Sequence, residues 1–295
     1  MHTKRDLTAA SATLEETTLS PAPIKRLRFE RIRWGSFIGI AVLHLACIAA
    51  PFTFTWGALA VAGFLYWAVF GLGVSMGYHR LLTHRGFETS KFFEYLLTML
   101  GTINFQGGPL YWVGTHRLHH RDSDTDEDPH SPRHGLLWAH VLWCLVYDHL
   151  GRDVTLAAGD LKKDRVMVWI ERWFVVPQIA LAGLLYLVGG WPWVIWGVAV
   201  RTVFTYHATW LVNSASHKWG YRNFETGDNS RNNWWVALFS FGEGWHNNHH
   251  AHQRSARHGL RWYEYDATWL TLWVLERLRI VQNVYAPGVV LGPRT

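Results

Sequence analysis

Four long apolar runs, joined in pairs by short uncharged turns, dominate the hydrophobic pattern of this chain. Residues 34–54 contain no charged side chain, and residues 57–78 are equally free of charge. Each run is long enough to cross about 30 Å of hydrocarbon as a helix. Only a short uncharged turn, around Pro51 to Thr55, separates the two runs. The pattern therefore predicts a transmembrane hairpin.

A second pair of apolar runs repeats this arrangement. Residues 173–190 are uncharged, and residues 193–212 are apolar apart from Arg201 and His207, with a Gly-Gly-Trp-Pro turn between the runs. Charged segments flank the pair on the side away from this turn. Buried helices of a large soluble protein would also be apolar. Paired runs of this length with charge on one side favour a membrane protein, and we expect four spans in two hairpins.

The polar segments predict which side of the membrane the chain faces. Residues 1–24 are rich in Thr, Ala, Ser and Pro, so we expect a disordered tail. Residues 25–33 then carry five basic residues against one acidic residue, and together 1–33 form a predicted basic cytosolic N-terminus. Two further apolar stretches, 92–110 and 136–147, and a shorter one at 234–241, fit helices along the interface that roof a cavity. The expected fold is all-α, with a cytosolic helical cap.

Composition supports the membrane assignment and limits the function. The chain is 49% hydrophobic and only 17% charged, whereas soluble domains average roughly 25% charged residues. The net charge of +6 lies partly at the N-terminus and carries no nucleic-acid motif, so we expect no nucleic-acid partner. The two cysteines, Cys47 and Cys144, cannot ligate an iron–sulfur cluster or form a disulfide framework. Electrons would have to come from a partner or another cofactor.

The 18 histidines supply the candidate chemistry, because many of them fall into groups with helical spacing. Residues three and four apart are neighbours on a helix, so each group can present its side chains together. On the predicted topology all the groups lie on the cytoplasmic side. The groups are His79 with His84, then His116, His119 and His120, then Asn213 with His217, and finally His246, His249 and His250.

This set predicts a site for two metal ions. Imidazole binds zinc, copper, iron and nickel, and one ion takes four to six ligands. Nine histidines and one asparagine exceed that number. Any one group alone could be a set of surface or core histidines, but four groups on one side favour a metal site. The remaining nine histidines lack this spacing and are expected to be structural or supporting: His2, His44, His130, His134, His140, His149, His207, His252 and His258.

Two shorter motifs point elsewhere and are less persuasive. Glu243 and His246, like Glu127 and His130, have the Glu-x-x-His spacing of ferritin-like di-iron bundles. The second pair contains a proline, and the chain offers no further helical glutamates facing inward. A His-Glu-x-x-His zinc-protease motif is absent from the sequence.

At these residues the chain resembles the membrane fatty acid desaturases of the Δ9, stearoyl-CoA/acyl-lipid type. His-x4-His, His-x2-His-His and a later His-x2-His-His match the histidine boxes of that family. The match extends to Asn-Ser-Ala-Ser-His at 213–217 and Gly-Glu-Gly-Trp-His-Asn-Asn-His-His at 242–250. It covers roughly residues 34–265. Residues 266–295 would then be a C-terminal cytosolic helix or tail.

The resemblance implies specific roles for residues of this chain. It implies a centre of two Fe2+ ions bound by the nine grouped histidines, with Asn213 holding one ion through a water. Asp124, Asp128 and Glu243 match carboxylates that orient ligand imidazoles, as metal-bound histidines usually require. The positions that match the family's acyl tunnel are Trp67, Gly71, Gln106, Trp112 and Thr209.

The resemblance also implies the reaction. The family uses O2 and two electrons to insert one cis double bond, expected here at Δ9 of a saturated acyl chain, with no catalytic residue beyond the metal centre. Residues 107–115 lack the polar and charged positions of the animal acyl-CoA enzymes, so a membrane lipid is favoured over acyl-CoA as substrate. The sequence shows no fused cytochrome b5 domain, so we expect a separate ferredoxin or cytochrome as donor.

Two alternatives stay open at this point. A fatty acyl or alkyl hydroxylase on the same scaffold would share the oxidant and differ in the fate of the substrate radical. A membrane metal carrier or sensor would need polar or ionisable residues within its spans, where the sequence offers only His44, Arg201 and His207. The sequence leaves chain length, double-bond position, acyl carrier, electron donor and oligomeric state undetermined.

Overall fold

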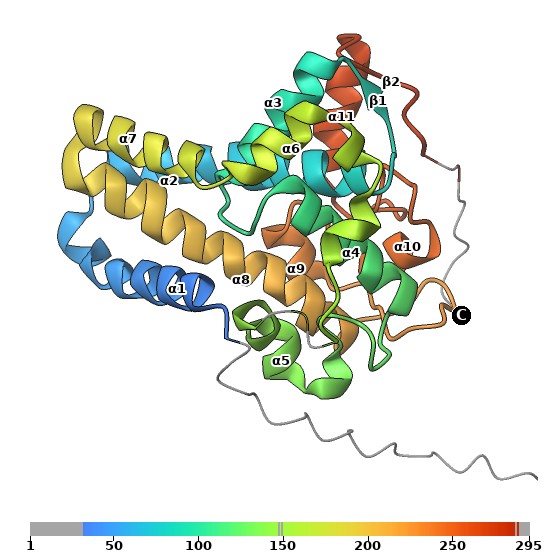
Figure 1. Ribbon diagram of the computed structural model, residues 1–295. Coiled ribbons are helices and arrows are strands. Elements are labelled where there is room, and N and C mark those ends of the chain that lie inside the picture. Colours follow the sequence, from blue (N-terminus) through green and yellow to red (C-terminus); the bar gives the residue numbers. More distant parts are fainter. Residues whose placement is uncertain (1–31, 147, 149, 287, 289–295) are drawn as a thin grey trace, which may run out of the picture.

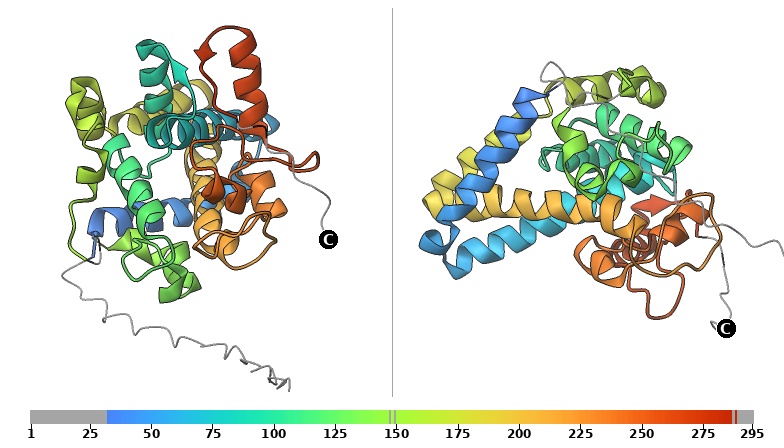
Figure 2. Two further views of the ribbon diagram at one scale, coloured as in Figure 1. Left: turned by 90° about the vertical axis from the view of Figure 1, so that its right-hand side faces the viewer. Right: turned by 90° about the horizontal axis from the view of Figure 1, so that it is seen from below.

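The protein is mostly helical in a computed structural model that describes residues 32–146, 148, 150–286 and 288 (Figure 1). Long helices form one part of the molecule, and shorter helices and loops form the other part (Figure 2). The predicted tail 1–24, nearly all of the basic run and the end of the predicted segment 266–295 lie outside the described residues. The long part comprises α1 (Trp34–Ala46), η2 (Cys47–Thr53), α2 (Trp56–Tyr66), η3 (Trp67–Thr83), α7 (Val176–Val194), η8 (Ile195–Val200), α8 (Arg201–Ser214) and η9 (Ala215–His217).

Three helical stretches in the described part of the chain are long and apolar enough to cross a membrane. They are Trp34–Thr53, Trp56–Thr83 and Val176–His217. The first two correspond to the first predicted hairpin, although α1 ends at Ala46 and continues as a 3-10 helix that contains Pro51. The third stretch contains both runs of the second predicted hairpin. The prediction of four spans therefore depends on whether this stretch is divided.

Gly190 divides the third stretch. Its backbone has φ 63° and ψ −159°, a conformation that is not helical and that favours glycine. At Gly189 a Cβ atom would lie 2.1 Å from the Trp193 ring, so the chain needs a small residue there as well. Figure 1 shows the ribbon reversing direction between α7 and α8. The predicted turn at 189–192 is thus present as a backbone break.

Arg201 is the one arginine or lysine between residues 176 and 212, and its charge is buried. Its guanidinium donates to Gly197 O at 3.0 Å, to Ile103 O at 3.1 Å and to the Gln178 side-chain oxygen at 2.9 Å. Burying an ion costs free energy unless hydrogen bonds replace its water. These bonds meet that requirement, and they tie α8 to α7 and to the loop that follows α3.

Shorter elements build the second part of the molecule. Its α-helices are α3 (Lys91–Thr102), α4 (Pro109–Asp122), α5 (Leu136–His140), α6 (Arg165–Arg172), α9 (Trp234–Phe239), α10 (His246–Ala251) and α11 (Ala267–Arg277). Its 3-10 helices are η4 (Pro132–His134), η5 (Leu142–Leu145), η6 (Val154–Ala158) and η7 (Leu161–Lys163). Strands β1 (Glu88–Thr89) and β2 (Val281–Gln282) pair antiparallel, with Glu88 opposite Gln282.

The ambiguous apolar stretches become short helices of this second part. Residues 92–110 form most of α3, a loop and the start of α4, while 136–147 contain α5 and η5, and 234–241 contain α9. The start of α4 has an identifiable cause. Pro109 occupies its first turn, and the Glu171 carboxylate accepts the N–H groups of Leu110 at 2.7 Å and Tyr111 at 3.3 Å. An acidic group at a helix N-terminus satisfies free donors and complements the helix dipole.

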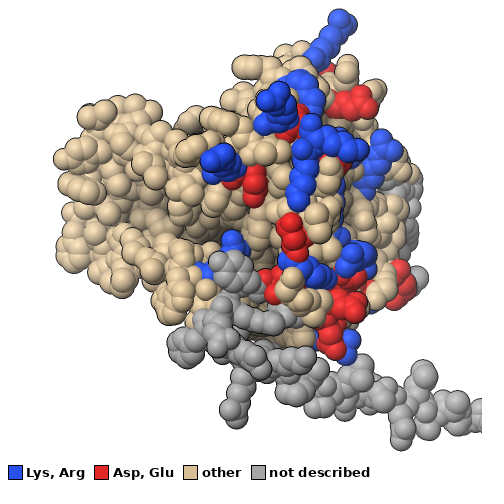
Figure 3. All heavy atoms as spheres, in the orientation of Figure 1, with Lys and Arg blue, Asp and Glu red and all other residues tan. Residues whose placement is uncertain are grey.

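Charge separates the two parts. On the face that Figure 3 shows, Lys, Arg, Asp and Glu side chains gather over the short helices, while the long helices are almost free of them. Many large apolar side chains of the long helices are exposed, among them Ile48, Phe52, Trp56 and Leu187. An exposed apolar surface of this extent suits contact with lipid rather than water.

Candidate metal centre

His79 and His84 come together because the helix that carries them is wound as a π-helix. From Trp67 to Thr83 the chain forms η3, and the N–H of His84 donates to the carbonyl of His79 five residues earlier, at 3.2 Å. An i→i+5 hydrogen bond brings residues five apart onto the same side of the helix. The two imidazole centroids are 4.8 Å apart. A regular α-helix would turn these side chains away from each other.

The next triplet lies on α4, as predicted, but its members serve different sites. The His116 and His120 nitrogens fall in one group of potential ligands, and His119 falls in another. Positions 116 and 120 are separated by one helical turn, with Nε2 atoms 3.0 Å apart. One short helix therefore contributes to two sites at once. The helical spacing of the triplet does not by itself decide which group each histidine joins.

The later triplet divides in the same way on α10. His249 joins the group of His116 and His120, while His246 and His250 join the group of His119. His217, at the end of η9, completes the second group, with its Nε2 atom 3.0 Å from that of His246.

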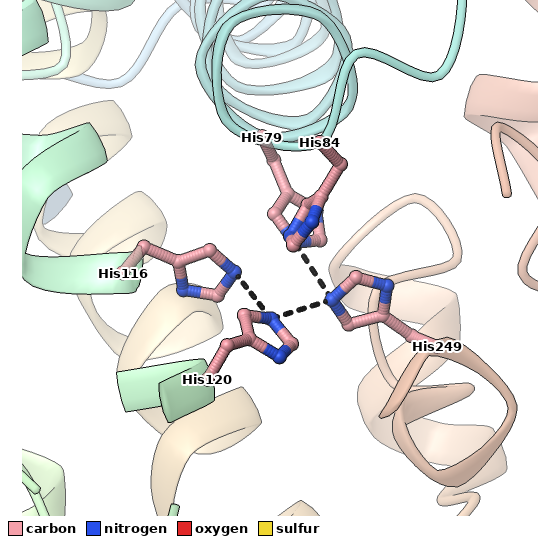
Figure 4. Close-up of side chains that lie close together, drawn as sticks. All are labelled: His79, His84, His116, His120 and His249. Atoms are coloured by element: carbon pink, nitrogen blue, oxygen red, sulfur yellow. Dashed lines mark hydrogen bonds between the residues drawn. The ribbon is translucent and has the colours of Figure 1, made fainter. Parts of the chain in front are cut away.

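The structure thus brings all nine predicted histidines into two compact groups. In each group the ligand atoms lie within 4.8 Å of one another. The first group, shown in Figure 4, contains His79, His84, His116, His120 and His249. The second group contains His119, His217, His246 and His250.

The spacing within the groups fits a metal ion at each centre. Two nitrogens that each lie about 2.1 Å from one ion at a right angle are about 3.0 Å apart. In the first group the Nε2 atom of His249 is 3.1 Å from that of His79 and 2.9 Å from that of His120. The Nε2 atoms of His84 and His250 are buried without a hydrogen-bond partner. Buried imidazole nitrogens that face one another need a cation, so the donor set fits metal binding.

Carboxylates fix the orientation of four of these rings. Glu243 lies 2.6 Å from His79 Nδ1, Asp128 lies 2.9 Å from His119 Nδ1, and Asp124 lies 3.0 Å from His217 Nδ1. Because each Nδ1–H donates to a carboxylate, the Nε2 lone pair is left to face the group. All three carboxylates predicted to orient imidazoles occupy that position.

A fourth carboxylate, Asp228, was not predicted. Its Oδ2 atom lies 2.5 Å from His250 Nδ1, the same arrangement as in the other three pairs. Asp228 is in the loop between η9 and α9, and no helical spacing relates it to a histidine in the sequence. It also caps its own loop by accepting the N–H of Ser230 at 2.9 Å.

Burial favours the neutral form of several of these imidazoles, which is the form that binds metal. Burial, followed by the neighbouring imidazoles, holds the pKa of His84, His116 and His249 well below the ordinary value of 6.5. Burial also lowers the pKa of His250 to about 4. Although burial alone would favour the neutral carboxyl of Asp128, the adjacent His119 and His130 hold its pKa below the usual range.

Glu243 joins the metal centre to a buried network of charges. One of its oxygens accepts from Arg80 Nε at 3.1 Å and from the Ser75 hydroxyl, while the other faces His79 and lies 3.2 Å from His258 Nδ1. Arg80 also donates two hydrogen bonds of 3.0 Å to Asp266 at the start of α11. Glu243 and His246 therefore face different partners, because the carboxylate faces His79 and Arg80 while the His246 imidazole faces His217.

A cavity of about 430 Å³, here called the large cavity, reaches the first histidine group. His116 and Asn213 line it, together with Gln106, Trp112 and Thr209 of the predicted tunnel. These three are linked, because Gln106 donates to Thr209 at 2.9 Å and accepts from the Trp112 indole at 3.3 Å.

The remaining tunnel positions lie elsewhere. Trp67 and Gly71 are not among the described residues that line the large cavity. A Cβ atom at Gly71 would meet the Trp67 side chain at 3.5 Å, so these two are neighbours on η3 as expected. Their assignment to the tunnel stays a prediction, as does the water-mediated role of Asn213.

Comparison with known proteins places these features in a family. The fatty acid desaturase family model matches residues 54–280. The sn-1 stearoyl-lipid 9-desaturase of Anabaena variabilis is 49% identical over 86% of this chain and 94% of its own length. The acyl-CoA 5-desaturase of Anemone leveillei is 44% identical over 90% of this chain and 85% of its own length.

A further cyanobacterial relative is the sn-1 stearoyl-lipid 9-desaturase of Synechocystis, which is 43% identical over 86% of this chain and 80% of its own length. The matched residues include every histidine of both groups. The chain therefore belongs to the fatty acid desaturase family, and it is an oxidoreductase of that family.

Proposed function

We propose that this protein is an O2-dependent acyl-lipid desaturase that inserts a cis double bond at Δ9 of a saturated acyl chain. The observation that carries the proposal is the pair of histidine groups beside the large cavity. Relatives named for 9-desaturation of lipid-linked stearoyl and palmitoyl chains support the position and the carrier. Three other relatives are named for 5-desaturation of CoA-linked acyl chains, so both properties require measurement.

The two groups would hold two iron ions. The group of five would be His79, His84, His116, His120 and His249, and the group of four would be His119, His217, His246 and His250 with Asn213 acting through a water. When bound, iron supplies the strongly oxidising O2 chemistry that removes hydrogen from an unactivated methylene, which no side chain here can do. The carboxylates of Asp124, Asp128, Asp228 and Glu243 keep the ligand rings aligned.

The chain itself positions the acyl group and excludes water. Trp112 and Thr209 bound the large cavity next to His116, and their bonds to Gln106 fix the shape of the wall. Burial of an acyl chain contributes about 0.8 kcal/mol for each methylene. This contribution is the same at every carbon, so the cavity wall and an anchor at the carboxyl end must select the reacting position. A dry site also protects reactive species from side reactions.

Topology and partners complete the proposal. The break at Gly190 supports four spans, with both hairpin turns on one side and the histidine groups, the cap and both termini in the cytoplasm. Two electrons per turnover would come from a separate ferredoxin or cytochrome.

The test is expression in a bacterium that lacks desaturases, followed by positional analysis of the double bond in each lipid class. We expect a Δ9 cis product in glycerolipids that requires O2 and an electron donor. His119→Ala should abolish the product while membrane insertion persists. A hydroxylated product would favour the hydroxylase alternative, and retained activity in His119→Ala would refute the di-iron assignment.

A further inference from the structure

A second cavity adjoins the large cavity and has more charged side chains in its wall. It has a volume of about 300 Å³ and is here called the polar cavity for the side chains of Asp148, Arg152 and Asp153, although apolar residues such as Val146 and Val154 line it as well. The large cavity is lined mainly by aromatic and small residues. The two cavities share four residues: Arg33, Tyr111, Thr115 and Trp143. These four residues, here called the junction, lie where the two cavities meet.

Hydrogen-bond donors concentrate at the junction. Arg33 donates from Nη1 to the Tyr111 hydroxyl at 2.5 Å, and its guanidinium carbon lies 4.5 Å from the centroid of the Tyr111 ring. Because this hydroxyl accepts from Arg33, its own proton is left to donate to a third group.

Trp143 adds a further donor at the same place. Its indole nitrogen is buried and has no hydrogen-bond partner among the described residues. An indole N–H can only donate, and leaving it unpaired in a buried position costs free energy. The arrangement of Arg33, Tyr111 and Trp143 therefore calls for an acceptor oxygen.

The depth of the junction suits an ester. Arg33 immediately precedes Trp34, where the first apolar helix α1 begins. Its guanidinium thus lies near the boundary between hydrocarbon and polar groups. The ester carbonyls of a glycerolipid lie at this same boundary.

The wall that α1 contributes to the large cavity consists mostly of small residues. They are Gly35, Ser36 and Gly39, beside the larger Ile40. A Cβ atom at Gly35 would meet nothing within 4 Å.

Charge in the polar cavity argues against a highly anionic carrier. The charged residues described in its wall are two arginines, Arg33 and Arg152, and two aspartates, Asp148 and Asp153. Their charges cancel. Arg152 is already engaged, because it donates to Asp148 at 2.9 Å and to Asp122 at 3.3 Å. A coenzyme A group with several phosphate charges would need a surplus of positive charge. A glycerolipid head group with little net charge fits better.

We propose that Arg33, Tyr111 and Trp143 bind the ester carbonyl of a glycerolipid, with the acyl chain in the large cavity and the glycerol and head group in the polar cavity. This inference rests on the proposed function and names its substrate class. It also makes the junction a determinant of regioselectivity. A carbonyl held at a fixed point sets which methylene of the chain lies beside the histidine groups.

The test compares an ester lipid with its ether analogue, which has the same chain length but no carbonyl oxygen. Full-length protein is mixed with distearoyl phosphatidylcholine and with dioctadecyl-ether phosphatidylcholine, and bound lipid is measured by native mass spectrometry. We expect the wild type to prefer the ester about tenfold or more, because a hydrogen bond to a charged donor contributes at that level. Arg33→Gln, Tyr111→Phe and Trp143→Phe should each reduce this preference.

The matched control is Arg121→Gln, which removes a positive charge whose side chain is 62% exposed, away from the junction. It should keep the wild-type ester preference. An equal affinity of the wild type for ester and ether overturns the proposal, as does a preference that survives in all three junction variants.

Product analysis then separates this inference from the proposed function. With active protein in vesicles, the junction variants should spread the double bond over neighbouring positions and lower the rate about tenfold, while iron content stays unchanged. If the junction variants place the double bond at the wild-type position and at the wild-type rate, the proposed ester-binding role of the junction is overturned, while the proposed desaturase activity is not. Faster reaction of stearoyl-CoA than of the vesicle lipid overturns the glycerolipid assignment. If the wild type forms no double bond, the proposed function fails. The preference for ester over ether lipid then still tests whether the junction binds the ester carbonyl.

Discussion

Asp228 Oδ2 lies 2.5 Å from Nδ1 of His250. Asp228 thus orients one imidazole of the second histidine group from a loop, although no helical spacing in the sequence relates the two residues. Asp228→Asn keeps the shape of the side chain but removes the charge that aligns the ring. We expect a 10- to 100-fold loss of iron affinity, as is typical for partners of metal-bound histidines. The measurement is iron per chain after dialysis against graded chelator.

The control for this change is Asp126→Asn, because the Asp126 side chain is 55% exposed and its ion-pair contact with Arg133 is long, at 3.8 Å. It should retain wild-type iron. Full iron retention in Asp228→Asn at every chelator concentration would contradict the assigned role.

Glu243→Gln should lower stability as well as iron content. The substitution removes a charge that faces both His79 and the buried Arg80, which then relies on Asp266 alone. Breaking a buried ion pair costs about 3–5 kcal/mol. Thermal unfolding of the metal-free protein in detergent checks this expectation. Glu225→Gln, at a side chain 94% exposed, is the matched control, and an equal unfolding temperature for the two variants would sink the prediction.

Gln178→Leu tests the buried charge of the long helices. The substitution removes the acceptor of one Arg201 hydrogen bond and leaves the guanidinium with two carbonyls. Hydrogen bonds to charged groups contribute about 1.5–3 kcal/mol, so we expect a clear fall in the thermal midpoint with iron content unchanged. Ile179→Leu, at an exposed neighbouring position, should have no such effect. A Gln178→Leu midpoint equal to that of the control would show that Arg201 does not depend on this acceptor.

Gly71→Leu tests whether Gly71 lies at the end of the acyl tunnel, one of the positions that the family resemblance assigns to it. A side chain here would contact Trp67 and Phe241 and occupy space between them. If the acyl chain ends at this place, the variant should prefer a chain two carbons shorter, roughly tenfold at 0.8 kcal/mol per methylene. The ratio of C16 to C18 unsaturated products in lipid extracts measures this chain-length preference. Gly63→Leu makes the same change where a Cβ meets nothing, and an identical ratio in both variants would remove Gly71 from the tunnel.

Much of the long part could be predicted from the sequence because hydrophobic length and turn residues act locally. The apolar run at 34–54 and the glycines at 189 and 190 correspond to real features of the backbone. The ends of helices were less predictable. The change from α-helix to 3-10 helix after Ala46 precedes Pro51 by several residues, so the proline indicates the region of the change but not the residue at which α1 ends.

The candidate ligands could also be predicted from the sequence, because their spacing is helical and their number is high. The division of these ligands between the two groups could not be predicted. His116 and His119 differ by three positions on one helix, yet only the packing of α4 between η3 and α10 decides which ion each would bind. Asp228 was missed for a related reason, since a carboxylate in a loop gains its role entirely from tertiary contact.

The π-winding of η3 has a consequence for how the protein is made. Residues 79 and 84 face the same way only while the helix is held out of its preferred winding, and their partners come from α4 and α10, far along the chain. No early fragment of a growing polypeptide can assemble the first group. A metal ion that needs all five ligands of the first group would therefore be bound only after residue 249 has been synthesised.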